Sequence, residues 1–259
     1  MNLQTFKSYL IEQVGGSKIP LDQLAETLNK LCSDSISAHD NHPLYRGNTH
    51  MFETVTDIGA GLFNSDQGID RKSHDTNNFY TTVFDHLFKT EFPQFPLRSR
   101  SFICTGNISD AKAYGEHVVI IPTNDAKIGN IGSRDIWNTR LTIFGANWPI
   151  NEINKRMVGL LGVDNPTYDL FMKADFPMTN DAVQEMIKTY PQSYSLTIEK
   201  FKEEIINAYR KVIINNFRAI TPREATTTNG EMWVGGECVV ILPEVWKSLQ
   251  IADNKWIVK

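Results

Sequence analysis

The stretch "TTTNGEMWVGGECVVILP", residues 226–243, joins a polar loop to two apolar runs that are separated by a pair of glycines. Two short apolar runs with two glycines between them are typical of a β-hairpin with a two-residue turn. Symmetric pairing around Gly235 and Gly236 places Glu237 beside the turn, and it places Glu231 at the start of the first strand, directly behind the polar loop. The stretch therefore predicts a C-terminal hairpin that carries two glutamates in different settings.

Four segments upstream of this stretch show strand and helix patterns in turn. The runs 44–47 ("LYRG"), 99–106 ("SRSFICTG") and 117–122 ("HVVIIP") predict strands, and the last of them predicts a strand that is fully buried. Segment 78–92 carries apolar residues at helical spacing and predicts a helix. Strands and helices are therefore mixed in this part of the chain, and we expect an α+β fold.

The domain organisation predicted from the sequence is one main domain with additions. Segments 3–13 and 20–32 predict two short helices, separated by "GGSK", which form an N-terminal helical addition over residues 1–42. The main domain then covers residues 43–259. Within it, the chain from about 133 to 220 is predicted to be mostly helical and is interpreted as an insertion.

Composition narrows the class of protein. The chain has 259 residues, of which 41% are hydrophobic and 22% are charged, with a formal net charge of −4. No apolar run is long enough to cross a bilayer and no long basic run is present, so neither a membrane span nor a broad nucleic-acid surface is expected. The three cysteines, Cys32, Cys104 and Cys238, are scattered without a CxxC pair, which favours reduced thiols and a cytoplasmic location.

Common site motifs are absent from the sequence. His39 and His42 form an HxxH pair in a polar loop, but no third ligand stands at a spacing typical of zinc sites, so no metal is predicted. The chain contains no GxGxxG, GxxxxGK[ST] or GxSxG pattern. The usual nucleotide-binding and hydrolase motifs therefore assign no function to this chain.

Three motifs in a fixed order carry a resemblance to a known family. They are "LYRG", "SFICTGNISDAKAYG", and a glutamate in "TTTNGEMWV" or "WVGGECVVILP". This order resembles the Arg–Ser–Glu branch of the ADP-ribosyltransferase superfamily, over residues 43–122 and 224–243, and "RKSHDT" and "FPLRSRSF" are similar to phage-encoded members. The resemblance implies a split antiparallel or mixed β-sheet core, here with N-terminal helices and a helical insertion, and NAD as the substrate.

The resemblance also implies which residues contact NAD. It assigns cofactor binding to Arg46, Gly47, Ser101, Thr105, Arg71 and Tyr114. An arginine offers a rigid fork of donors that suits a diphosphate, and a glycine lets the backbone approach a ligand closely. Arg98 and Arg100 are further candidates for phosphate contact or are rim charges. The second motif departs from the family pattern, because Cys104 and Gly106 stand where serines are expected.

The catalytic carboxylate has two candidates. The resemblance favours Glu231, behind a substrate-recognition loop, over Glu237, and it assigns a supporting catalytic role to Ser101. A carboxylate at this place stabilises the positive charge that develops on the ribose when nicotinamide leaves. Neither glutamate has a glutamate or glutamine two residues earlier, because Asn229 and Gly235 stand there. In enzymes of the resembled family, the residue at that position helps to select an arginine as acceptor. Its absence therefore argues against modification of protein arginine.

Three functions are compatible with these residues. The first is an NAD-dependent mono-ADP-ribosyltransferase that modifies a host macromolecule, protein or nucleic acid, and releases nicotinamide. The second is an NAD glycohydrolase, and the third is a non-catalytic binding or virion-associated protein on the same fold. The sequence does not identify the acceptor, the role of segment 133–220 or the oligomeric state.

Overall fold

The computed structural model describes residues 16–36, 42–67, 79–132, 136–190 and 196–259. Within these ranges the fold is α+β, with an antiparallel nine-stranded sheet in the order β1-β3-β11-β5-β2-β4-β10-β6-β9. The strands of this sheet are β1 (Gly16–Lys18), β2 (Leu44–Gly47), β3 (Ala60–Asn64), β4 (Phe102–Thr105), β5 (His117–Pro122), β6 (Lys127–Ile131), β9 (Phe217–Ile220), β10 (Glu231–Gly235) and β11 (Glu237–Ile241). Two small hairpins complete the strands: β7 (Arg140–Ile143) with β8 (Ala146–Pro149), and β12 (Leu249–Ala252) with β13 (Lys255–Val258).

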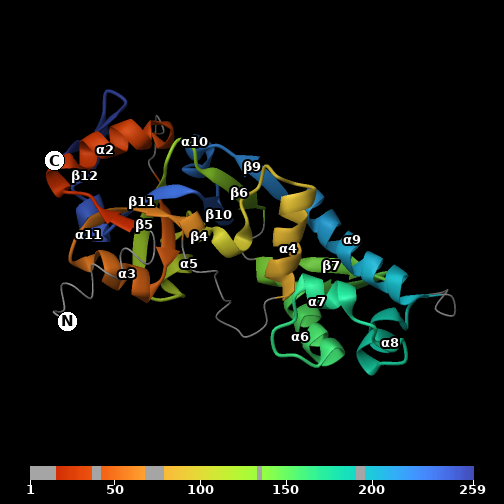
Figure 1. The fold of residues 1–259 in the computed structure, drawn as a ribbon. Helices are drawn as coiled ribbons and strands as arrows, with labels where there is room; N and C mark the ends of the chain where they lie inside the picture. The colour runs from red at the N-terminus through yellow and green to blue at the C-terminus, as the bar shows by residue number, and fades with distance from the viewer. Residues whose placement is uncertain (1–15, 37–41, 68–78, 133–135, 191–195) are drawn as a thin grey trace, which may run out of the picture.

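Helices cover the sheet and extend beyond one end of it (Figure 1). They are α2 (Leu24–Leu31), α3 (Thr49–Thr56), α4 (Phe79–Thr90), α5 (Ile108–Lys112), α6 (Ile150–Leu161), α7 (Tyr168–Lys173), α8 (Asp181–Ile187), α9 (Ile198–Asn216), α10 (Pro222–Ala225) and α11 (Pro243–Trp246). Two short 3-10 turns matter for the site, η4 (Arg98–Arg100) and η5 (Ile136–Asn138). The helix expected over 78–92 and the strand expected over 117–122 are confirmed as α4 and β5.

The buried strand β5 shows how the sheet is covered on both faces. Side chains of a strand alternate between the two faces of its sheet. Val118 and Ile120 pack into one hydrophobic core, and Val119 and Ile121 pack into a second core on the opposite face. An apolar residue at every position from Val118 to Ile121 is therefore required, which explains the continuous run in the sequence.

The predicted C-terminal hairpin is wrong. β10 pairs with β4 and β6, whereas β11 pairs with β3 and β5, so three other strands separate them in the sheet. Gly235 belongs to β10 and packs so closely on Pro96 that a Cβ there would lie 2.5 Å from the Pro96 Cβ. Gly236 has a φ of 94° and exchanges hydrogen bonds with Ser65. The two glycines therefore make a corner that moves the chain from one half of the sheet to the other.

This corner splits the sheet into two halves that enclose a common core. Only Gly236 stands between β10 and β11, so the two halves must meet there. On the other side, β2 and β4 are joined by a single register pair, Tyr45 with Thr105. One core takes Val118 and Val240 from the first half and Met232 from the second half, together with their neighbours. The sheet therefore curves around this core.

The described part of the N-terminal segment contributes a strand to the sheet as well as a helix. Within residues 16–36, the expected separator "GGSK" supplies β1, which pairs with β3 at the sheet edge. The helix expected over 20–32 is present as a 3-10 turn (Leu21–Gln23) followed by α2, and α2 buries Leu24 and Leu28. Segment 3–13 lies outside the described residues.

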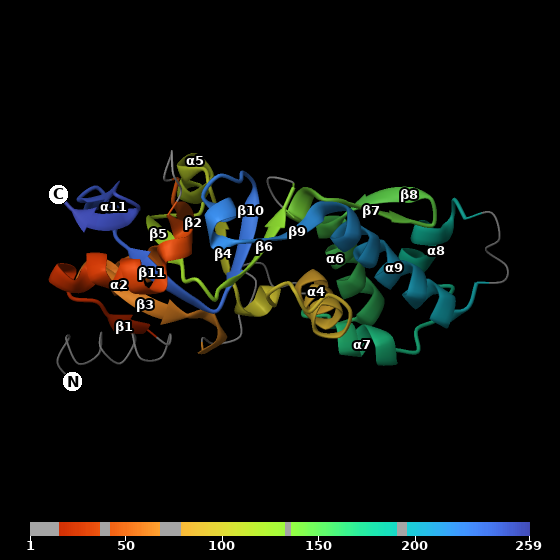
Figure 2. The same cartoon turned by 90° about the horizontal axis from the view of Figure 1, so that it is seen from above.

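The predicted helical insertion needs two corrections. It contains the β7–β8 hairpin as well as α6 to α9, and its last residues form β9 of the main sheet. In addition, α4, which precedes residue 133, packs into the same hydrophobic core as α6 to α9. We call α4, α6 to α9 and the β7–β8 hairpin the helical lobe. It lies at the β9 end of the sheet, away from the C-terminus (Figure 2).

Candidate functional site

Three motifs that are far apart in the sequence lie on three neighbouring strands. β2, β4 and β10 are adjacent in the sheet. Thr105 of β4 pairs with Tyr45 of β2 on one side and with Glu231 of β10 on the other. Paired residues of antiparallel strands point to the same face of a sheet, so these three side chains form a row across one face. This row is the centre of the candidate site.

The carboxylate of Glu231 is held by two donors. Its side chain is 7% exposed, and Oε2 accepts a hydrogen bond from the backbone N–H of Ile136 at 3.0 Å. Oε1 accepts a hydrogen bond from the indole Nε1 of Trp233 at 2.5 Å. Hydrogen bonds to an ionised group are short and strong. The carboxylate is therefore fixed in orientation at the junction of the sheet and the helical lobe.

Trp233 is itself held by a cation and by aromatic rings. The Arg98 guanidinium carbon lies 5.3 Å from the Trp233 ring centroid and 4.4 Å from that of Tyr80. Arg98 Nη1 also donates a hydrogen bond to Thr81 Oγ1 at 2.8 Å. Tyr80 and Thr81 belong to α4, so the turn before β4 ties the helical lobe to β10 through this stack.

Tyr45, at the end of the row opposite Glu231, contacts His117. Their rings meet edge to face with centroids 6.0 Å apart. Burial raises the pKa of Tyr45. Burial lowers the pKa of His117, and the nearby Lys112 acts in the same direction. Both groups therefore favour their neutral forms beside the candidate site.

The polar loop before Glu231 is folded against the end of β4. Thr226, Thr227 and Thr228 each donate a side-chain hydrogen bond to a carbonyl oxygen of α10, which anchors the loop to that helix. A Cβ at Gly106 would lie 3.1 Å from the backbone oxygen of Thr228. Because Gly106 has no side chain, this loop can approach the end of β4 closely.

Ser101 lies on the same face as Glu231 by strand alternation, but its hydroxyl is used within its own turn. The side chain is buried, and Oγ donates a hydrogen bond to the backbone oxygen of Leu97 at 2.5 Å. Thr105 is half-buried, and its Oγ1 accepts a hydrogen bond from the backbone N–H of Asn107 at 3.1 Å. Of the two hydroxyls in this strand, that of Thr105 is the one placed opposite Glu231.

Arg46 does not face the row. It follows Tyr45 in the strand and therefore points to the opposite face, into the core between the two half-sheets. Its side chain is 6% exposed, and Nη1 donates a hydrogen bond of 3.3 Å to the backbone oxygen of Ile103. Burial lowers the pKa of Arg46, while the nearby Cys104 and Cys238 oppose that shift. The expected presentation of this arginine to a dinucleotide is not what the geometry shows.

Gly47 and Tyr114 occupy the edge of the site region. A Cβ at Gly47 would lie 1.9 Å from the backbone oxygen of Ala111 in α5, so the missing side chain admits this helix rather than a ligand. Tyr114 follows α5 and is 71% exposed. Arg71, the remaining residue expected at the cofactor, lies outside the described residues.

Glu237 is not brought near Glu231 in the sheet order. It opens β11, which β5, β2 and β4 separate from β10, and its side chain is exposed. Glu237 lines an open groove of about 290 Å³ together with Lys30, Thr123 and Asn124. The structure therefore separates the two candidate glutamates, whereas the sequence analysis placed both of them in a single hairpin.

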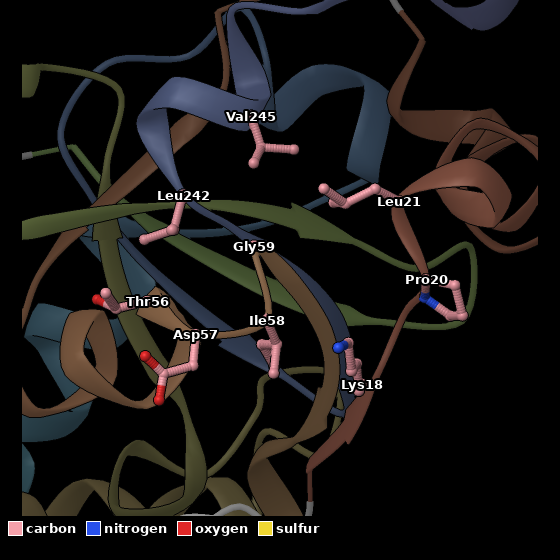
Figure 3. Close-up of a pocket in the computed structure, with 9 residues that line it drawn as sticks. All are labelled: Lys18, Pro20, Leu21, Thr56, Asp57, Ile58, Gly59, Leu242 and Val245. Carbon is pink, nitrogen blue, oxygen red and sulfur yellow. The ribbon is translucent and has the colours of Figure 1, made fainter.

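A larger groove lies elsewhere on the molecule. It has a volume of about 760 Å³ and is lined mainly by apolar side chains, among them Leu21, Ile58, Leu242 and Val245. Figure 3 shows Leu21 and Val245 close together on one side of Gly59, with Thr56 and Asp57 on the other side of the view. None of the residues expected at the catalytic site or the cofactor lines it.

Two properties of the described residues bear on other classes of site. Within these ranges, no three His, Cys, Asp or Glu side chains gather closely enough to hold a metal ion. The helices in the described part of the chain include none that is both long and apolar enough to cross a membrane. All three cysteines are buried free thiols.

The sequence interpretation missed Trp233 and Tyr45. Trp233 stands two residues after Glu231, so strand alternation already places both on one face. Tyr45 immediately precedes Arg46, the residue expected to bind the cofactor. The donor from Ile136 had no comparable signal, because a backbone N–H from a distant turn leaves no pattern in the sequence.

Comparison with known proteins adds no assignment. No family model matches this chain, and neither the curated proteins nor the solved structures contain a match. The interpretation of the site therefore depends on its own geometry.

Proposed function

We propose that this protein is an NAD-dependent mono-ADP-ribosyltransferase that transfers ADP-ribose to a macromolecular acceptor, protein or nucleic acid, in a phage–host setting. The observation that carries the proposal is the row Tyr45–Thr105–Glu231. Motifs that resemble those of one superfamily, separated widely in the sequence, come to adjacent positions on neighbouring strands. The presence of these residues in one sheet does not by itself require them to be register partners, so their alignment supports a shared role.

The proposed reaction breaks the bond between the nicotinamide nitrogen and the anomeric carbon of the ribose. The bonding electron pair leaves with nicotinamide, which becomes neutral, and positive charge develops on the ribose ring. An acceptor nucleophile then donates a pair to the anomeric carbon and loses its proton. A fixed carboxylate beside the ribose stabilises the charge in the transition state, and Glu231 is the group proposed for that role.

The other residues have supporting roles in this proposal. Thr105, opposite Glu231, offers a hydroxyl to the ribose, and Tyr45 offers a half-buried aromatic ring against which a planar group can stack. Ser101 is assigned to the turn before β4 rather than to substrate contact, because its hydroxyl is bonded to Leu97. Arg46 is assigned to holding β2 against β4, since it bonds the Ile103 carbonyl from the opposite face.

The proposal is tested by measuring nicotinamide release from NAD, with and without cell lysate as a source of acceptor. Release that depends on lysate, together with label from a tagged NAD in a macromolecule, supports transfer. Release that does not depend on lysate indicates a glycohydrolase. NAD binding without release indicates the non-catalytic binding protein. Labelled lysate then identifies the acceptor.

Two matched variants test the role of Glu231. Glu231→Gln keeps the side-chain size but removes the charge, and loss of one preorganised electrostatic group costs turnover on the order of 100- to 1000-fold. Glu237→Gln makes the same chemical change at an exposed position that three intervening strands separate from β10, and it is expected to leave turnover nearly unchanged. Equal losses in both variants, or none in either, would reject this assignment.

A further inference from the structure

We infer that Trp233 is a positioning residue for the Glu231 carboxylate, and that the helical lobe acts on the site through this indole. Trp233 Nε1 donates to Glu231 Oε1 at 2.5 Å, and both side chains lie on the same face of β10. The second donor to the carboxylate, the N–H of Ile136, comes from η5, which also packs on the helical lobe. Both oxygens are therefore oriented by groups that depend on this lobe.

The surroundings of Trp233 prevent its ring from rotating. The side chain is fully buried. Its ring contacts those of Phe84, Phe88 and Phe217 edge to face, with centroids 5.5, 5.7 and 5.0 Å away. A ring enclosed in this way has one available orientation, so its N–H direction is fixed before any ligand arrives.

Arg98 completes this arrangement. Its guanidinium lies over the rings of both Trp233 and Tyr80, so it joins β10 to α4. A cation over the face of an indole polarises the ring and is attracted by its negative face. The positive charge of Arg98 is thereby held over the same ring whose N–H binds Glu231. Residues of the helical lobe thus set the direction of a carboxylate that belongs to the sheet.

The first test is independent of the proposed function. The indole N–H signals of the five tryptophans are recorded by nuclear magnetic resonance and assigned by replacing each tryptophan in turn with phenylalanine. We expect the Trp233 signal to lie far downfield of that of Trp256, whose buried Nε1 has no hydrogen-bond partner among the described residues. In Glu231→Gln the Trp233 signal should move upfield, because a neutral amide is a weaker acceptor than a carboxylate.

Assignment by elimination keeps this test decisive. If Trp233→Phe does not fold, replacement of the other four tryptophans still identifies the Trp233 signal. A Trp233 signal that does not move in Glu231→Gln, while the protein stays folded, would overturn the inference. A shift confined to Trp233 would support it.

The second test addresses catalysis and rests on the proposed function. Trp233→Phe removes the N–H donor to Glu231. In metal sites, loss of a group that orients a ligand side chain typically lowers activity by about 10- to 100-fold, and we take this as the scale. We expect kcat for nicotinamide release to fall by roughly this factor while KM changes little, because substrate contacts remain. Trp256→Phe is the matched control, since it makes the same change at a buried indole that binds no carboxylate.

The two tests separate the two ways of failing. If the wild-type protein releases no nicotinamide, the proposed function is wrong, and the resonance experiment alone decides the role of Trp233. If release occurs but Trp233→Phe and Trp256→Phe retain equal kcat, the positioning role is rejected and the proposed function stands.

Discussion

Thr105 and Glu231 are register partners on β4 and β10, so the second and third motifs of the chain meet side by side on one face of the sheet. Arg46, from the first motif, lies on the opposite face and bonds the backbone of Ile103. Each of the three motifs therefore contributes one residue to the row Tyr45–Thr105–Glu231, while Arg46 of the first motif holds the strands from the opposite face.

Replacing Arg46 should affect stability more than NAD affinity. In Arg46→Lys the ammonium group is too compact to keep the guanidinium contacts with the Ile103 carbonyl and the Phe102 ring. Loss of a buried hydrogen bond costs about 1–3 kcal/mol, which urea unfolding measures. Arg218→Lys, at an exposed position of β9, is the control and should stay within about 0.5 kcal/mol. Wild-type stability with weakened NAD binding would return Arg46 to the ligand site.

Adding one methyl group at Gly47 should destabilise the protein. The Cβ of Gly47→Ala would lie 1.9 Å from the Ala111 oxygen, so α5 must move away from β2. The same substitution at Gly159, inside α6, meets nothing within 4 Å. Gly159→Ala should therefore stabilise the helix by about 0.5–1 kcal/mol. Thermal unfolding of the two variants should give shifts of opposite sign, and stabilisation of Gly47→Ala would contradict the packing of α5.

The cysteines should be inert in the folded protein. Cys32, Cys104 and Cys238 are buried, and burial raises the pKa of Cys32 to about 12. The thiolate is the reactive form, so a chromogenic disulfide reagent should label none of them at neutral pH. All three should react after unfolding in guanidinium chloride. Rapid labelling of one thiol under native conditions would show that its surroundings open readily.

Stability should fall when the protein is made mildly acidic. Burial lowers the pKa of His117 and of His86 below the ordinary value of 6.5. The unfolded chain then binds protons more readily than the folded one, so stability is present above pH 6.5 and is lost as the pH falls through the lower folded value. Urea unfolding between pH 7 and about pH 5 measures this loss. It should shrink in His117→Gln and in His86→Gln, and a loss of the same size in both variants and in the wild type would contradict the prediction.

The sequence by itself determined the local elements. The apolar run within 117–122 required a strand buried on both faces, and the helical spacing over 78–92 required a helix with one buried side. It also singled out Glu231 as the glutamate behind a polar loop. Each of these features depends on residues within one short segment, where side-chain periodicity and turn chemistry decide the outcome.

The tertiary structure decided what the strands pair with and which face each side chain occupies. Gly235 and Gly236 suit a hairpin turn, but tight packing on Pro96 and a positive φ make them a corner between two half-sheets. The same topology turns Arg46 inward and brings Ile136 to Glu231. These outcomes depend on contacts between segments far apart in the chain, and the free energy of burying their shared cores outweighs local turn preferences.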